Sequence, residues 1–322
     1  MVSVGELIEG WEQIMVKAKQ YATKKVKWNF KANWMLYLML APAVIVTVLF
    51  MYIPMYGIVI AFQDYNPAFE FLGSPWVGLK WFEFVFQMPD FKYIMRNTII
   101  IAAGKLILNQ VIPILFALML NEVRNKYIKK SVQTLVYLPH FFSWVIVSGI
   151  FIDLLSTDGL VNQFLGCFGI SPIFFLGSNE YFQGTMIVTD VWKEFGWNSI
   201  LYLAAISGIN PELHEAACLD GAGRFQRIWH VTLPGMRGTI ILLLILNLSN
   251  ILNAGFDQIF NLYNPAVYRT GDIIDTFVYR MGLEQAQFSL STAVGLFKSL
   301  IGLVLIILSR RIAYKALDYR IF

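Results

Sequence analysis

Charge is scarce in this sequence, because only 14% of its 322 residues are Asp, Glu, Lys or Arg. Soluble domains carry roughly 25%. Hydrophobic residues make up 57% of the chain, and no stretch reads as a soluble domain with its own core. The deficit of charge therefore indicates a protein embedded in the lipid bilayer, and we expect no nucleic-acid partner.

Catalytic and metal-binding motifs are missing as well. The phosphate-binding pattern Gly-x4-Gly-Lys-Ser/Thr does not occur, so the chain is not an ATPase of that kind. His214-Glu215-x-x-Cys218 begins like a zinc-protease helix but lacks the second histidine. The other two histidines, His140 and His230, are isolated, and we interpret both as structural. We expect no enzyme activity, no metal site and no cofactor in this chain.

Long apolar runs are what the sequence does contain. Six of them are long enough to cross about 30 Å of hydrocarbon as helices. They lie near 34–62, 98–120, 131–156, 182–206, 238–261 and 288–309. Residues 79–88 are a candidate for a short surface helix between the first two. The prediction is an all-α membrane protein with six transmembrane helices, some of them kinked by proline.

The distribution of basic residues orients these helices. Most of the 25 Lys and Arg residues lie in residues 1–33, 121–130, 207–237 and 310–322. Because basic loops stay in the cytoplasm, both termini are expected there, in a multi-pass protein of a bacterial cytoplasmic (inner) membrane. Cys167 and Cys218 then lie on or near opposite sides and cannot pair.

Residues 1–33 are unlike a secretory signal, since acidic and apolar residues alternate where a signal has an apolar core. Their spacing suits a cytoplasmic amphipathic segment at the membrane interface, with a partly disordered tail as the alternative. We expect residues 34–322 to form the transmembrane domain.

The loop 207–237 carries the most specific pattern. Pro211 suits the first turn of a helix, Glu212 and Glu215 suit its N-terminal end, and Gly221 suits its stop. A short exposed helix is therefore expected, followed by a turn and a second helical stretch. Ala216 and Ala217 are small enough to let another surface approach. From these features alone, an ordinary connecting loop remains an equal alternative.

The same loop resembles the EAA loop of binding-protein-dependent ABC import permeases. Glu215-Ala216-Ala217 is followed after three residues by Gly221, and after nine more by Val231-x-Leu233-Pro234. Asp220-Gly221-Ala222 matches the fuller form found in sugar permeases, and Val231 stands where the family prefers Ile. The motif positions are Glu215, Ala216, Ala217, Asp220, Gly221, Ala222, Gly223, Leu233 and Pro234.

Further segments are similar to the MalF/LplB-type branch of carbohydrate permeases. They are Ala41-Pro42, Ile53-Pro54-Met55-Tyr56-Gly57, Gly73-Ser74-Pro75-Trp76-Val77-Gly78-Leu79, Gly159-Leu160-Val161-Asn162, Trp192-Lys193-Glu194-Phe195-Gly196-Trp197-Asn198 and Gly255-Phe256-Asp257. This branch includes permeases for acidic oligosaccharides such as oligogalacturonide and alginate.

The resemblance implies both partners and a mechanism. In the family, the EAA helix docks on a cytoplasmic ATPase and couples ATP-driven closure to alternating access. It implies a second homologous permease, two ATPase subunits that bind ATP and Mg, and an extracytoplasmic solute-binding protein. The resemblance also implies that the chain passes an oligosaccharide across the membrane without altering it. The narrower form of this expectation is an acidic oligosaccharide, such as a fragment of alginate or pectin.

Polar residues inside the spans are candidates for the substrate path, because polar groups in lipid usually face the protein interior or water. Asn247, Asn250, Asn253 and Asp257 fall on one face if the fifth span is a continuous helix. Amides both donate and accept hydrogen bonds, which suits sugar hydroxyls. The further candidates are Asn198, Tyr202, Trp192 and Trp144. Helix–helix adhesion is the alternative role for these side chains.

Substrate charge is harder to predict, since the basic residues inside the spans are only Lys105, Lys193 and Lys298. Three alternatives to a sugar permease stay open. They are an ABC permease for a non-sugar solute, an ion-coupled secondary transporter, which would need no EAA loop, and an intramembrane enzyme, for which no catalytic constellation is visible.

Overall fold

The computed structural model describes residues 30–248 and 251–317 and divides the chain into two units, Met1–Gly57 and Ile58–Phe322. The helical run that begins in the first unit comprises α2 (Phe30–Thr47), η1 (Val48–Tyr52) and η2 (Ile53–Phe62). Its apolar side chains are exposed, among them Met39 and Phe50. A helix that is apolar all round suits a lipid environment. The predicted segment 1–33 lies almost entirely outside the described residues.

Helices account for the regular structure of the described part of the second unit, where Gln63 and Trp76 form an isolated β-bridge. The elements are α3 (Glu70–Gly73), α4 (Lys80–Gln87), α5 (Pro89–Asn121), α6 (Lys126–Tyr137), η3 (Leu138–Phe141), α7 (Trp144–Leu155), α8 (Leu160–Gly166), α9 (Phe182–Ser207), α10 (Pro211–Leu219), α11 (Arg224–Arg227), η4 (Ile228–Thr232), α12 (Leu233–Gly235), α13 (Arg237–Leu248), α14 (Phe256–Leu262), η5 (Pro265–Val267), α15 (Tyr268–Gly271), α16 (Ile274–Tyr279), η6 (Arg280–Glu284) and α17 (Phe288–Leu317).

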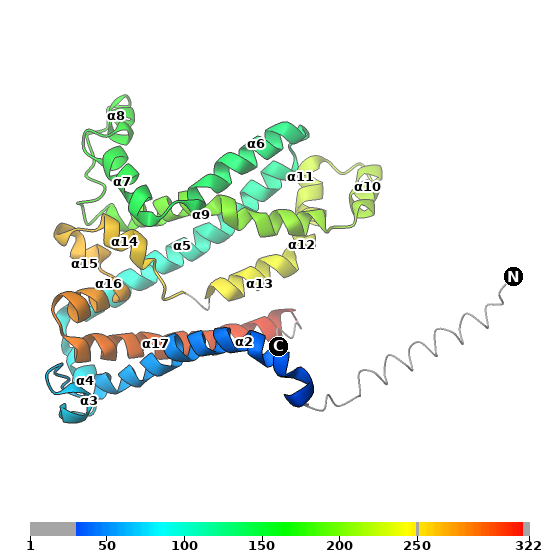
Figure 1. The fold of residues 1–322 in the computed structure, drawn as a ribbon. Coiled ribbons are helices and arrows are strands. Elements are labelled where there is room, and N and C mark those ends of the chain that lie inside the picture. The colour runs from blue at the N-terminus through cyan, green and yellow to red at the C-terminus, as the bar shows by residue number, and fades with distance from the viewer. Residues whose placement is uncertain (1–29, 249–250, 318–322) are drawn as a thin grey trace. The chain divides into compact units, whose positions relative to one another are not determined.

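Within the second unit, α5 packs along α9, which also contacts α6 and α13 (Figure 1). Three groups of buried apolar side chains hold this arrangement. One, which includes Ile101, Met186 and Ile259, joins α5, α9 and α14. A second, which includes Ile94 and Leu290, joins α5 to α16 and α17. A third, which includes Tyr202 and Met236, lies at the α10 end of α9.

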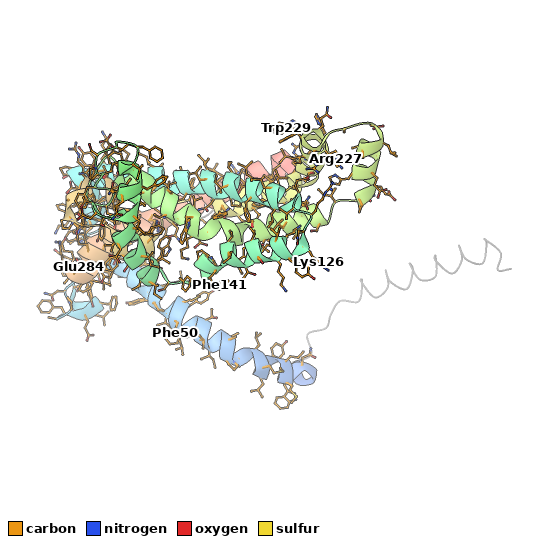
Figure 2. All side chains as sticks on the ribbon, turned by 90° about the horizontal axis from the view of Figure 1, so that it is seen from above. Phe50, Lys126, Phe141, Arg227, Trp229 and Glu284 are labelled. Carbon is orange, nitrogen blue, oxygen red and sulfur yellow. The ribbon has the colours of Figure 1, made fainter. Side chains whose placement is uncertain are left out.

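The two ends of this unit differ. The loop with α10 and α11 projects from one end, and α7, α8, α14 and α15 gather at the other (Figure 1). Figure 2 shows Lys126, Arg227 and Trp229 at the first end and Glu284 at the opposite one. The basic loops 121–130 and 207–237 therefore share one end of the bundle, as the charge pattern predicted.

The helical prediction is confirmed, but two of the predicted spans are not continuous helices. The span predicted at 131–156 breaks at η3, because Pro139 lacks an N–H and the chain restarts at Ser143, whose Oγ accepts from the N–H of Ile146 at 3.4 Å. In the span predicted at 238–261, α13 comprises Arg237–Leu248 and α14 begins only at Phe256, and the described residues 251–255 between them are not helical.

Four segments of the described residues have the length and apolar composition to cross a membrane. They are Asn33–Phe62, Pro89–Asn121, Trp144–Gly166 and Phe288–Ser309. A fifth candidate is the pair Arg224–Gly235 and Arg237–Leu248, bent by 57°. The helix α9 matches the predicted span 182–206 in position, but it carries Asp190, Lys193 and Glu194 near its middle.

Candidate functional site: a projecting loop and a polar cavity

The projecting loop folds as its sequence predicts. Asn210 caps α10, since its Oδ1 accepts from the N–H of Glu212 at 3.1 Å, and Pro211 occupies the first helical position. At the other end Gly221 adopts φ +81°, a left-handed conformation that suits glycine. The N–H of Ala222 bonds the carbonyl of Ala217 at 2.9 Å, which completes a Schellman-type stop.

This loop presents apolar side chains to the outside. Leu219 is 90% exposed and Phe225 88% exposed, and Trp229 follows one turn after Phe225. Gly223 N–H donates to the side chain of Gln226 at 2.7 Å, which fixes the start of α11. A rigid helix–turn–helix with an exposed apolar face is a surface suited to docking another protein.

A polar cavity of about 200 Å³ lies in the second unit, between α5, α9 and the break after α13. Three predicted path residues line it: Asn198, Asn247 and Asn253. Lys105, Asn109 and Asp190 line it as well. Two charged side chains and four amides therefore share this one cavity.

Hydrogen bonds order the wall of this cavity. Asn109 Nδ2 donates to Asp190 Oδ2 at 2.8 Å, and Asn198 Nδ2 lies 3.5 Å from Asn109 Oδ1. Asp190 Oδ1 also pairs with Lys105 Nζ at 3.0 Å, with both side chains largely buried. A satisfied network of this kind holds its members in one geometry.

Lys105 fixes the break between α13 and α14. Its Nζ donates to the carbonyl of Ala254 at 2.7 Å and to Oε1 of Gln258. Gln258 in turn donates from Nε2 to the carbonyl of Met186 at 2.8 Å and to Thr189 Oγ1 at 2.7 Å. The broken backbone is thus held to α5 and α9. Lys105 satisfies the carbonyl of Ala254, which would accept a backbone hydrogen bond if the helix were continuous.

The predicted stripe on the fifth span is wrong as a helical face. Asn247 lies near the end of α13 and Asn253 in the non-helical segment, yet both reach the polar cavity. Asp257 is exposed on α14 and does not line this cavity. Asn250 lies outside the described residues. Because the helix breaks, the spacing of 100° per residue does not apply across these positions.

The remaining candidates lie apart from the polar cavity. Tyr202 is buried and lines a neighbouring cavity of about 300 Å³ together with Asn198 and Asn247. Trp192 packs edge-on against Phe151, with ring centroids 5.4 Å apart.

Trp144 belongs to a charged cluster around His140, which the sequence did not reveal. The ring of His140 stacks on that of Trp197, with ring centroids 4.5 Å apart, and His140 Nδ1 lies 2.6 Å from Glu194 Oε2. Lys193 pairs with Glu194 at 2.8 Å and lies over the ring of Trp144. The cluster joins α9 to the break between α6 and α7, and the structural role of His140 stays a prediction.

Sequence reasoning named Lys105 only as a basic residue in a span, and it missed Asn109 and Asp190. A signal was present, since an ionisable residue in an apolar run indicates a functional or pairing site. Which carboxylate partners which lysine depends on helix packing, and the sequence alone does not give it.

Comparison with known proteins gives a consistent result. The family model described as binding-protein-dependent transport system inner membrane component matches residues 109–321. The polygalacturonan/rhamnogalacturonan transport system permease protein YteP of Bacillus subtilis (strain 168) is 48% identical over 87% of this chain and 88% of its own length. Protein LplB of the same organism is 43% identical over 91% of this chain and 93% of its length.

A solved structure has the same fold. It is a chain of a bacterial alginate ABC transporter in complex with an alginate pentasaccharide-bound periplasmic protein. The match has a TM-score of 0.82 and 40% identity and covers 89% of this chain and 96% of that chain. These findings confirm the predicted resemblance. The chain belongs to the family of inner-membrane components of binding-protein-dependent transport systems, and it is a permease, a transport component rather than a catalytic one.

Proposed function

We propose that this chain is the permease subunit of an ATP-driven importer that moves an acidic oligosaccharide into the cytoplasm of a bacterium. The observation that carries the substrate class is its 48% identity to a permease named for polygalacturonan and rhamnogalacturonan, together with its 40% identity to a chain of an alginate transporter. Both names refer to acidic polysaccharides, and both matches cover most of the chain.

The proposed topology has six crossings, with both termini in the cytoplasm. The α6–α7 pair supplies the third crossing, α9 the fourth, and α13 with α14 the fifth, each broken or charged where polar groups meet inside the bundle. The shared position of the two basic loops beside α10 supports a cytoplasmic location for that end. Residues 1–33 form the cytoplasmic interfacial segment, and residues 34–322 form the transmembrane domain.

The projecting loop is the proposed coupling element. Its motif positions Glu215, Ala216, Ala217, Asp220, Gly221, Ala222, Gly223, Leu233 and Pro234 contact an ATPase subunit, which binds ATP and Mg. The capped, glycine-terminated helix α10 supports this role, because a lever transmits movement only if it is rigid.

The polar cavity is the proposed part of the translocation path. Asn109, Asn198, Asn247 and Asn253 offer amide groups that donate to and accept from sugar hydroxyls. One such chain encloses too little wall for an oligosaccharide, so a second homologous permease supplies the other side. Two ATPases and an extracytoplasmic solute-binding protein complete the importer.

The test is to tag this chain, purify it gently from its own membrane and identify the copurifying proteins by mass spectrometry. We expect a P-loop ATPase, a second permease and, on reconstitution with its binding protein, ATP hydrolysis stimulated by oligogalacturonate. Recovery of the chain alone, under conditions that preserve a known importer, would contradict the proposal. Stimulation by a non-sugar solute instead would retain the importer and replace the substrate.

A further inference from the structure

A second and larger cavity lies beside the polar one. It measures about 790 Å³ and is lined by residues of α14, α16, η6 and α17. Asn253, in the break after α13, lines both cavities. The two cavities therefore share one proposed path residue, which is the reason for assigning the larger one to the same route.

The wall of this cavity has the chemistry of a saccharide site. Phe256, Tyr279 and Phe288 supply aromatic surface, and Asp275 and Lys298 supply charge. Rigid aromatic faces with a few placed polar groups are typical of small-molecule sites.

The aromatic part of the wall is held in place from behind. Phe256 stacks on Phe260 with ring centroids 5.2 Å apart, and Tyr279 meets the same Phe260 edge-on at 4.8 Å. Phe256 and Tyr279 therefore share one support and keep their orientation without a ligand.

Lys298 differs from the other two span lysines in its free hydrogen-bonding capacity. An ammonium group has three donors. Lys105 Nζ has three acceptors, on Ala254, Gln258 and Asp190.

Lys193 Nζ has two acceptors, the carbonyl of His140 at 3.1 Å and Glu194, and its side chain is only 6% exposed. Lys298 Nζ contacts Asp275 Oδ1 at 2.5 Å, and among the described residues that is its one acceptor. Its side chain is 23% exposed, so two donors remain available at the cavity.

We propose that Lys298 binds the carboxylate of an acidic sugar residue in this cavity, through the donors that its pair with Asp275 leaves unused. The inference rests on the proposed function and names its specificity-determining residue. A charge-assisted hydrogen bond is roughly twice as strong as a neutral one. A uronate therefore binds more tightly than a neutral sugar of the same shape, which cannot form this bond. Asp275 competes with the substrate for the same ammonium and thereby weakens binding.

The experiment uses the complete permease–ATPase complex, without the binding protein, so that the permease alone selects. Equilibrium dialysis measures the binding of trigalacturonate and of its carboxyl-reduced, neutral counterpart. For Lys298→Gln we expect about tenfold weaker binding of trigalacturonate, the size of a lost charged hydrogen bond, and little change for the neutral trisaccharide. Lys298→Arg retains trigalacturonate binding.

Asp275→Asn is the matched variant on the other side of the pair. It removes the competing carboxylate, so we expect tighter binding of trigalacturonate. If the ion pair only holds α16 against α17, both variants should impair assembly of the complex. Each variant should then weaken the binding of trigalacturonate and of the neutral trisaccharide to the same extent. If Lys298→Gln fails to assemble, Asp275→Asn decides, because unchanged or weaker binding of trigalacturonate overturns the inference.

The outcomes also separate this inference from the proposed function. Wild-type binding of trigalacturonate together with an unchanged affinity in Lys298→Gln overturns the role of Lys298 alone. A wild-type complex that binds neither trisaccharide but imports another solute overturns both.

Discussion

Replacing Gly255 by alanine tests whether the break between α13 and α14 is held by Lys105. Gly255 adopts φ +93°, and a Cβ at this position would lie 2.6 Å from Lys105 Nζ. The left-handed conformation costs a non-glycine residue about 1–2 kcal/mol. The ammonium must also move, and each charged hydrogen bond that it loses costs about 1.5–3 kcal/mol. We therefore expect Gly255→Ala to destabilise the protein by about 3–5 kcal/mol.

The measurement is the unfolding temperature and the monodispersity of the purified complex, with transport in proteoliposomes beside it. Gly184→Ala is the matched control, because Gly184 lies in α9 and an added Cβ has nothing within 4 Å. Alanine in a helix is favoured over glycine by up to about 1 kcal/mol, so this control should be neutral or slightly stabilising. Equal stability of the two variants would refute the idea that Lys105 packs closely against the backbone at Gly255 and holds the break in place.

Three other substitutions test neighbouring parts of the same account. Lys105→Met should lower the free energy of unfolding by about 3–5 kcal/mol, because it leaves the largely buried Asp190 without its cation. Adding Asp190→Asn should restore part of this stability. A double variant less stable than Lys105→Met would contradict the pairing. Gly196→Leu should force α9 away from α6, because even a Cβ there would overlap the carbonyl of Val136, and the loss of roughly 1–3 kcal/mol should appear as a lower unfolding temperature. Gly221→Leu should leave the chain inserted but uncouple ATP hydrolysis from transport, whereas Gly221→Asn, which tolerates a left-handed φ, should keep more coupling; full transport by the leucine variant would refute the lever.

Much of the helical framework could be predicted from hydrophobicity alone. The helices α5, α9 and α17 contain the predicted spans 98–120, 182–206 and 288–309 in full, and α9 matches its span to within one residue. The surface helix expected at 79–88 is α4, Lys80–Gln87. A continuous apolar run in lipid has to form its backbone hydrogen bonds within itself, so a run long enough to cross the membrane forms a helix.

The projecting loop was predictable for a different reason. Its start and stop depend on local chemistry, with Asn210 and Pro211 at one end and Gly221 at the other. Caps and left-handed stops are read from neighbouring residues, and no distant contact is needed to form them.

The breaks in the third and fifth spans could not be predicted in the same way. Pro139 marks the first break, but many membrane helices keep a proline and only bend. At the second break the carbonyl of Ala254 is satisfied by Lys105, a residue distant in sequence on α5. A lone glycine in an apolar run does not reveal such a partner, so the asparagine stripe was predicted on one continuous helix, whereas residues 251–255 are not helical.

The pairing of charge inside the bundle constrains how the importer can select an acidic substrate. Lys105 pairs with Asp190, Lys193 with Glu194, and Lys298 with Asp275. Each lysine in the predicted spans is therefore neutralised by a carboxylate nearby, and these pairs leave little net positive field along the route. Attraction of a polyuronate by net charge is thus a poor mechanism here. Selection in the permease has to come from donors that a pair leaves unused, and such donors serve a uronate only while its carboxylate is within hydrogen-bonding distance.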